Sequence, residues 1–240
     1  MNKETLEIEL QKLGIELSTQ QIKQIDEFCL FLLSENQKYN LTAIRNYEDM
    51  LLKHVYDSLT IINTTDLNND KSILDIGSGA GFPGIILQIV FPNLKVTLLD
   101  SNGKKTQFLN LVKEKLNLVN LTVINQRAED YIKKMRESYD IVTARAVASL
   151  NILLELAVPF IKVETGEFIA MKGDVEDEIS LAIDTSVYLN CHIISIMELK
   201  LPFENSKRTL VTVIKKEKTS KKYPRRYDQI IKKPLKTAQK

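Results

Sequence analysis

The sequence predicts an α/β protein built on a doubly wound, mostly parallel β-sheet, preceded by a helical N-terminal extension. Three observations predict this fold. An apolar run of strand length, SILDI at 72–76, leads directly into a glycine-rich turn and a helical pattern. Six further apolar runs follow up to residue 215, most of them separated by helical patterns, and such alternation is typical of parallel sheets. The earlier residues show helical spacing instead.

The chain divides into three parts by pattern and composition. We expect a helical N-terminal extension over residues 1–68, an α/β domain over 69–216 and a basic C-terminal tail over 217–240. A length of 240 residues fits one such domain with an extension. The apolar fraction of 44% is enough for an ordinary buried core.

The N-terminal extension carries local signals of helix boundaries. Ser18 and Gln21 have the spacing of a capping box, and Gly14 is placed to end a shorter helix before them. One helical face is then apolar through Ile22, Ile25, Cys29, Leu32 and Leu33. A further helix is indicated by Met50, Leu51, His54, Val55, Leu59 and Ile62, and the polar residues 64–70 predict a loop.

The α/β domain contains seven predicted strands. In chain order they are SILDI (72–76), KVTLL (95–99), LTVIN (121–125), DIVTAR (140–145), EFIAMK (167–172), CHIISIMEL (191–199) and TLVTVIK (209–215). We expect a mostly parallel order, in which the last two strands are the candidates for antiparallel pairing.

The turn after the first strand predicts a nucleotide-like ligand. Gly77, Gly79 and Gly81 let the backbone pass close to a ligand. Together with Gly84 they satisfy both G-x-G-x-G and the dinucleotide fingerprint G-x-G-x-x-G. The glycines alone therefore leave open which cofactor binds, and a tight turn without a ligand is the simplest alternative.

Three acids favour one of these cofactors. Asp75 precedes the glycines, Asp100 ends the second predicted strand, and Glu129 follows the third. Carboxylates would repel a pyrophosphate, which prefers a bare helix N-terminus. They suit S-adenosylmethionine, which carries a sulfonium and an ammonium group and no phosphate.

Ligands of such sheets bind outside the carboxyl ends of the strands. There Asp100 is placed to accept hydrogen bonds from a ribose diol. Glu129 is placed to accept a hydrogen bond from the exocyclic amine of adenine, with the Ala128 backbone alongside. Capping of a helix is the alternative role for both acids. Phe82 could cover part of the ligand. Arg145 ends the fourth strand, where the alternative to a functional role is an ion pair with a nearby acid.

The charge of the chain is unevenly distributed. The net charge is +2, yet residues 215–240 hold eleven Lys or Arg and two acids. Such a segment predicts a polyanionic partner, and Tyr223 and Tyr227 beside Lys222, Arg225 and Arg226 could stack on unpaired bases. A solvated, disordered tail is the alternative.

Several classes of protein do not fit the sequence. No apolar run approaches the length of a membrane span, and the charged N-terminus does not resemble a signal peptide. Cys29 and Cys191 lie in apolar stretches and are expected to be buried, reduced thiols. We expect a cytoplasmic protein without a membrane partner. Nothing in the sequence requires an oligomer, so we expect a monomer. We also expect no metal site, since His54 and His192 lie in unrelated segments.

Motifs along nearly the whole chain point to one family. They are KYNLTAIR (38–45), HVYDSL (54–59), LDIGSGAGFPGI (74–85), LLDSNGKKTQFL (98–109), RAED (127–130), TARAVASL (143–150), MKG (171–173) and the tail KKYPRR…KKPL. Together they resemble the RsmG family, also called glucose-inhibited division protein B. Its members are bacterial 16S ribosomal RNA guanine-N7 methyltransferases.

The resemblance implies a Rossmann-like class I S-adenosylmethionine-dependent methyltransferase fold and methylation of a guanine N7 in 16S ribosomal RNA. Matching the family's cofactor positions gives Gly77, Phe82, Ala128, Glu129 and Arg145. One departure is the lysine pair Lys104 and Lys105, where many members have an arginine second. That exchange puts only a phosphate contact in doubt.

The expected chemistry needs few catalytic groups. Guanine N7 has an exposed lone pair and no proton, so it can attack the sulfonium methyl without a general base, and catalysis rests on positioning. Arg145 or Lys172 could donate to the guanine O6. Asn40 and His54 are candidates for RNA or cofactor-edge contact, with capping or core roles as the alternative. His54 and Asp57 face the same side of their helix.

Two hypotheses from other classes remain open. One is a nicotinamide-dependent oxidoreductase that uses G-x-G-x-x-G, although no proton donor for it is evident. The other is a non-catalytic RNA- or ribosome-binding module that kept the fold. Whether free 16S ribosomal RNA or the assembled small subunit is the substrate also remains open.

Overall fold

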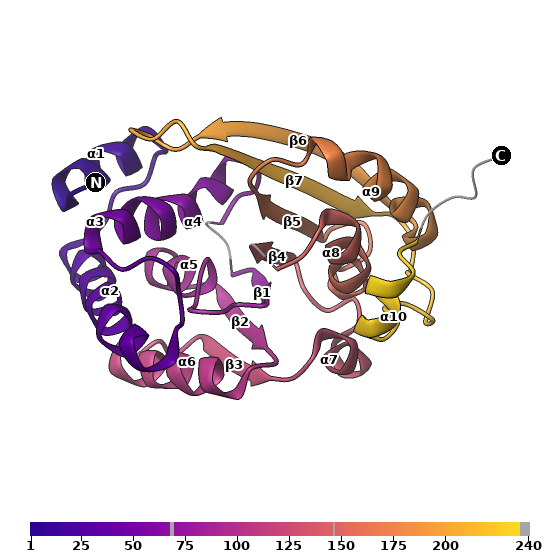
Figure 1. The fold of residues 1–240 in the computed structure, drawn as a ribbon, viewed down its shortest axis with the longest axis horizontal. Coiled ribbons are helices and arrows are strands. Elements are labelled where there is room, and N and C mark those ends of the chain that lie inside the picture. Colours follow the sequence, from indigo (N-terminus) through magenta and orange to yellow (C-terminus); the bar gives the residue numbers. More distant parts are fainter. Residues whose placement is uncertain (68–69, 146, 236–240) are drawn as a thin grey trace.

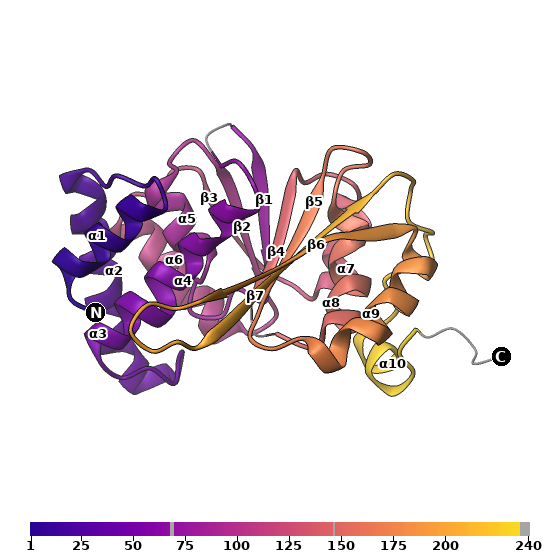
Figure 2. The ribbon, with the colours of Figure 1, turned by 90° about the horizontal axis from the view of Figure 1, so that it is seen from above.

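The computed structural model describes residues 1–67, 70–145 and 147–235, in which a seven-stranded sheet separates two layers of helices (Figures 1 and 2). All seven predicted strands are present, each within two residues of its predicted ends. They are β1 (Ser72–Ile76), β2 (Lys95–Asp100), β3 (Leu121–Asn125), β4 (Ile141–Arg145), β5 (Glu167–Lys172), β6 (Cys191–Lys200) and β7 (Lys207–Lys215).

The strand order β3-β2-β1-β4-β5-β7-β6 confirms the doubly wound fold. The five strands β1 to β5 pair with one another only in parallel. The chain moves outward from β1 to β3 and then returns to β4, so the switch point lies between β1 and β4. The turns that follow these two strands meet there, which is where such sheets bind ligands.

The last two strands were the candidates for antiparallel pairing. The structure confirms such pairing for β7, which is antiparallel to both of its neighbours, β5 and β6. Because β6 is reversed relative to β7, it runs in the same direction as the parallel strands.

Each face of the sheet is covered by its own helices (Figure 2). One face carries α5 (Gly84–Val90) and α6 (Gly103–Lys115), and the other carries α7 (Ala128–Met135), α8 (Leu150–Ala157) and α9 (Glu176–Leu189). Two clusters of buried apolar residues match these layers, with Ile85 in one and Leu153 in the other, both fully buried.

The N-terminal extension consists of helices that pack onto the first layer. It begins with α1 (Lys3–Lys12) and α2 (Thr19–Tyr39), and α2 has the predicted capping box between Ser18 and Gln21. The Gln21 side chain also donates to the carbonyls of Ile89 and Val90 at 3.1 and 2.8 Å, which ties α2 to the end of α5. The expected boundary between residues 68 and 69 lies outside the described residues.

The helix predicted around residues 50–62 is not uniform. It runs as α3 (Tyr47–Met50), a π-helical turn (Leu51–Tyr56), α4 (Asp57–Leu59) and a 3₁₀ turn (Thr60–Asn63). π-Helical turns often occur at functional sites because they change which side chains and carbonyls share a face.

The C-terminal segment, residues 217–235, is not the solvated, disordered tail that was the alternative to a polyanion-binding segment. It returns to the domain, and its helix α10 (Tyr227–Lys232) lies beside α7 and α8 (Figure 1). Residues 236–240 of the expected tail lie outside the described residues. No helix within the described ranges is long and apolar enough to cross a membrane.

Candidate active site

Two cavities lie at the carboxyl edge of the sheet, close to the end of β4. Val147 lines the first cavity, of about 330 Å³. Arg145 lines the second, of about 380 Å³. The carboxyl ends of β1 and β2 contribute to the first cavity, and the ends of β4 and β5 to the second.

The first cavity gathers the predicted cofactor residues Gly77, Asp100, Ala128 and Glu129. The Asp100 carboxylate is 8% exposed, and its two oxygens accept from the Gly79 N–H at 2.9 Å and the Asn102 N–H at 2.8 Å. These bonds hold the acid against the glycine turn. A carboxylate fixed in this way is suited to accept from a ribose diol.

The glycine turn requires residues without a side chain. Gly77, Gly79 and Gly81 have φ values of 69°, 58° and 103°, in the region that other L-residues rarely adopt. A Cβ on Gly77 would lie 2.6 Å from Cγ2 of Val147, which lines the same cavity. A Cβ on Gly81 would lie 2.3 Å from Cδ1 of Ile85. Gly77 thus shapes the cavity, whereas Gly81 allows the helix beneath to pack.

Asp75 lies buried beneath this turn. One oxygen accepts from the Gly84 N–H at 3.0 Å, and Oδ1 has no hydrogen-bond partner among the described residues. Burial raises the pKa of Asp75 to about 7, and the nearby Asp100 charge adds to the rise. Asp75 lines neither cavity, so its expected role beside a cationic cofactor stays a prediction. The acids that do line the first cavity, Asp100 and Glu129, suit S-adenosylmethionine better than a pyrophosphate.

Phe82 lines neither of the two cavities. It is 4% exposed, and its ring stacks on His54 with 4.4 Å between centroids. The Arg145 guanidinium lies 5.3 Å from the same ring centroid. In this structure Phe82 supports the neighbouring side chains, and its expected contact with the cofactor stays a prediction.

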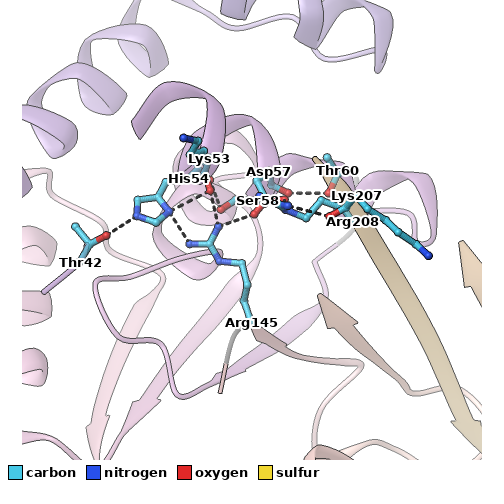
Figure 3. A network of polar contacts seen from close by, with 9 residues as sticks. All are labelled: Thr42, Lys53, His54, Asp57, Ser58, Thr60, Arg145, Lys207 and Arg208. Atoms are coloured by element: carbon cyan, nitrogen blue, oxygen red, sulfur yellow. Dashed lines mark hydrogen bonds and ion pairs between the residues drawn. The ribbon is translucent and has the colours of Figure 1, made fainter. Parts of the chain in front are cut away.

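The second cavity is lined by a polar network (Figure 3). Arg145 Nη1 donates to Asp57 at 2.9 Å and to the Lys53 carbonyl at 3.1 Å, and Nη2 lies 3.0 Å from His54 Nδ1. Asp57, which is 4% exposed, also accepts from Arg208 Nε at 3.0 Å. The ion pair considered as an alternative role for Arg145 is therefore present.

The network favours one tautomer of His54. Nδ1 lies 3.0 Å from Arg145 Nη2 and 3.1 Å from the Lys53 carbonyl. Because an arginine can only donate, the contact with Arg145 requires an unprotonated Nδ1, which leaves the proton on Nε2 to be donated to Thr42 Oγ1 at 2.8 Å. Burial and the Arg145 charge lower the pKa of His54 to about 3. The imidazole is thus neutral near pH 7, with both ring nitrogens engaged.

The π-helical turn assembles this network. Lys53 and His54 lie within it, and Asp57 follows it directly. Their carbonyl, imidazole and carboxylate groups all face Arg145 (Figure 3). The N-terminal extension thereby holds an arginine that belongs to the sheet.

The remaining predicted site residues of the domain and the extension lie in different places, and only some of them line a cavity. Lys172 lines the second cavity, where Nζ donates to the Ala148 carbonyl at 2.8 Å and pairs with Glu178 at 3.0 Å. Asn40 is the C-cap of α2, where its backbone has the left-handed conformation, and its side chain accepts a hydrogen bond from Arg45. It lines neither cavity. Lys105 lines the first cavity, and Lys104 is exposed near the start of α6.

The predicted RNA residues of the C-terminal segment need correction. Tyr223 is 4% exposed within the apolar core, so its ring is not free to stack on a base. Arg225 makes charge-assisted bonds to the buried Glu155 and is a structural residue. Lys222 and Arg226 remain on the surface.

Lys53 and Arg208, which line the second cavity, were not predicted from the sequence. In the sequence both resemble solvated surface cations, so only the fold reveals them. Tyr227, which was expected to stack on unpaired bases, lines the first cavity instead. Among the described residues no group of three or more His, Cys, Asp or Glu is arranged to hold a metal ion.

Comparison with known proteins agrees with this geometry. A family model described as rRNA small subunit methyltransferase G matches residues 21–211. Proteins named Ribosomal RNA small subunit methyltransferase G are 44% identical over 225 residues in Caldanaerobacter subterraneus subsp. tengcongensis, covering 93% of this chain and 94% of that protein. In Bacillus cytotoxicus the identity is 45% over 232 residues, covering 94% and 95%.

Solved structures support the fold. A precorrin-6y C5,15-methyltransferase from Geobacter metallireducens aligns with a TM-score of 0.52 and 16% identity, covering 66% of this chain and 86% of that one. Fibrillarin from Aeropyrum pernix, in complex with S-adenosyl-L-methionine, aligns with a TM-score of 0.50 and 14% identity, covering 66% and 73%. The oxidoreductase and the non-catalytic module are no longer needed as explanations. The chain belongs to the rRNA small subunit methyltransferase G family and is an S-adenosylmethionine-dependent methyltransferase.

Proposed function

We propose that this enzyme methylates N7 of a guanine in 16S ribosomal RNA, by direct attack of N7 on the methyl group of S-adenosylmethionine. The bound cofactor supplies an electrophilic methyl group. The protein then has to hold the guanine so that the N7 lone pair faces that group. Because N7 carries no proton, the reaction needs no general base at the attacking atom.

One observation carries this proposal: the two groups of the second cavity that resemble general bases are both engaged. The accepting nitrogen of His54 is 3.0 Å from Arg145 Nη2, and its pKa is lowered to about 3. The Asp57 carboxylate is shared between Arg145 and Arg208 at 2.9 and 3.0 Å. Such a cavity is poorly suited to removing a proton and well suited to a nucleophile that has none.

The charge of the second cavity supports a guanine in RNA. It is lined by two lysines and two arginines against one acid: Lys53, Lys172, Arg145, Arg208 and Asp57. The acceptors O6 and N7 mark the Hoogsteen edge of guanine, and arginine or lysine is its usual partner. We assign the O6 contact to Arg145 or Lys172. Correct orientation alone can lower a barrier by roughly 7–11 kcal/mol.

The surface cations Lys104, Lys222 and Arg226 are proposed to contact RNA phosphates. Lys105 at the first cavity and His54 at the second are proposed to face the RNA at the reacting site. Asn40, which lies outside both cavities, is proposed to contact the RNA from the end of α2. The partner is 16S ribosomal RNA, either free or within the small ribosomal subunit. Such a substrate places the reaction in the cytoplasm, and the site as described is complete within one chain.

The test measures methyl transfer to defined RNA. The protein is incubated with methyl-labelled S-adenosylmethionine and either free, unmethylated 16S ribosomal RNA or small subunits that contain it. We expect label in one guanine, at a position that becomes sensitive to borohydride and aniline cleavage, as N7-methylguanine does.

The matched control is the same RNA with 7-deazaguanine at the labelled position, since it lacks only the attacking nitrogen. Label in the deaza substrate, or label at another guanine atom, would contradict the proposal. Comparison of the two substrate arms distinguishes free RNA from the assembled subunit.

A further inference from the structure

We propose that Tyr227 is a cofactor-binding residue and that the C-terminal segment, residues 217–235, is a fixed wall of the cofactor cavity. The inference depends on S-adenosylmethionine as the cofactor and not on the guanine target. It gives this basic segment a role that its charge does not suggest. Three observations support it, namely its anchoring, its position at the cavity and its bond to Glu129.

The strongest anchor joins Arg225 to Glu155 of α8. Glu155 is 1% exposed, and its Oε1 accepts from the Arg225 backbone N–H at 2.9 Å and from Nε at 2.8 Å. Its Oε2 accepts from Nη2 at 2.6 Å. A buried carboxylate with three such bonds fixes both the side chain and the backbone of Arg225. The segment is therefore held two residues before Tyr227.

Further contacts hold the segment on both sides of Arg225. Arg136 Nη2 donates to the Tyr223 carbonyl at 2.6 Å, and Tyr223 itself is buried. Ile230 of α10 is 1% exposed, and Thr185 Oγ1 donates to the Leu235 carbonyl at 2.9 Å. Contacts of this extent indicate a docked part of the domain and not a solvated chain.

Tyr227 lies at the cavity itself. It lines the first cavity together with Ala128 and Glu129, the two residues that are expected to hold the adenine. Its backbone N–H donates to Glu129 Oε1 at 3.3 Å. The segment thus orients a carboxylate of the cofactor site and adds an aromatic side chain beside it, a residue type on which bases stack well.

The test measures cofactor affinity without RNA. Isothermal titration calorimetry of the full chain with S-adenosylmethionine compares the wild type with Tyr227→Ala and Tyr227→Phe. We expect Tyr227→Ala to weaken binding by about tenfold, as loss of an aromatic stacking partner does. Tyr227→Phe keeps the ring and is expected to remain within about twofold of the wild type.

The matched control is Arg226→Ala, the preceding residue. Its side chain is 79% exposed and pairs only with Asp228 among the described residues, so cofactor affinity should not change. Circular dichroism confirms that each variant is folded. Unchanged affinity in folded Tyr227→Ala would overturn the proposal, as would an equal loss in Arg226→Ala.

A second variant tests the anchor. Arg225→Ala should expose the segment to trypsin and weaken cofactor binding at the same time, and saturating S-adenosylmethionine should slow trypsin cleavage of the wild type. Release of the segment with unchanged affinity would also overturn the proposal. Loss of RNA methylation with normal cofactor binding would instead count against the guanine assignment.

Discussion

His54 accepts a hydrogen bond from Arg145, with 3.0 Å between Nδ1 and Nη2. This bond joins a π-helical turn of the N-terminal extension to the end of β4. Because the arginine also binds the Lys53 carbonyl and Asp57, its guanidinium is held in one orientation before any substrate arrives. The extension is in this sense part of the proposed active site.

The first prediction concerns the protonation of His54. Burial and the Arg145 charge lower its pKa to about 3, so the ring should stay neutral from pH 5 to 9. Since Arg145 donates to Nδ1, the proton should be on Nε2. Long-range ¹H–¹⁵N correlation spectra, in which His192 gives the only other histidine signal, should show the Nε2–H tautomer throughout. A midpoint of titration between pH 5 and 8 for His54 would contradict this.

The second prediction concerns the stability that Asp57 provides. In Asp57→Ala, Arg145 and Arg208 both lose their carboxylate partner, and their side chains are only 14% and 24% exposed. Removing one partner of a buried pair typically costs about 3–5 kcal/mol, and the partial exposure here lowers the expected loss of unfolding free energy to about 2–4 kcal/mol.

Urea unfolding of Asp57→Ala measures this loss, and Asp228→Ala is the matched control. The Arg226–Asp228 pair is 79% and 53% exposed, so its removal should cost less than about 1 kcal/mol. Equal losses in the two variants would show that the Asp57 pairs are no stronger than a surface pair.

The sequence was most informative where structure depends on neighbouring residues. The capping box at Ser18, the glycine turn at Gly77 and the acid at Asp100 each have a local physical cause, and all three are present. The strands of the sheet could also be predicted, because apolar runs that alternate with helical patterns are visible in consecutive residues. These features predict a ligand site at the carboxyl edge of the sheet, where the first cavity lies.

The sequence was least informative where charges meet across the fold. Asp57 and Arg208 are 151 positions apart, and Glu155 and Arg225 are 70 apart. In a sequence such residues look like solvated surface charges, because burial depends on tertiary packing. The same ambiguity made the segment around Arg225 resemble a free polyanion-binding tail, when a buried carboxylate holds it.

The third prediction concerns Gly77. In Gly77→Ala the residue keeps a φ of 69°, and its Cβ lies 2.6 Å from Cγ2 of Val147, so Val147 must shift at the cofactor cavity. We expect cofactor affinity to fall by more than about tenfold, since strain of roughly 1–2 kcal/mol is combined with a displaced wall. Calorimetric titration with S-adenosylmethionine measures it.

Gly14→Ala separates strain from displacement. Gly14 has a φ of 76°, but nothing lies within 4 Å of a Cβ there. This variant should lose about 1 kcal/mol of stability and keep its cofactor affinity. If both variants bound the cofactor normally, the glycine turn would not shape the cofactor site.

The last prediction concerns proton release from Asp75. Burial raises its pKa to about 7 in the free enzyme, whereas an unfolded aspartate titrates near pH 4. Between these values the folded state binds the extra proton, so this group makes the protein less stable as the pH rises from about 4 to 7. A cationic cofactor favours the ionised carboxylate, so its binding should expel the proton.

Calorimetric titrations at pH 6.5, in two buffers of different ionisation enthalpy, measure the protons released when S-adenosylmethionine binds. The matched variant is Asp75→Asn, whose side-chain oxygen can still accept from the Gly84 N–H but cannot titrate. Protons released by the cofactor's own amino group contribute equally to both proteins. The wild type should therefore release more protons than Asp75→Asn, and equal release would show that Asp75 does not respond to the cofactor's charge.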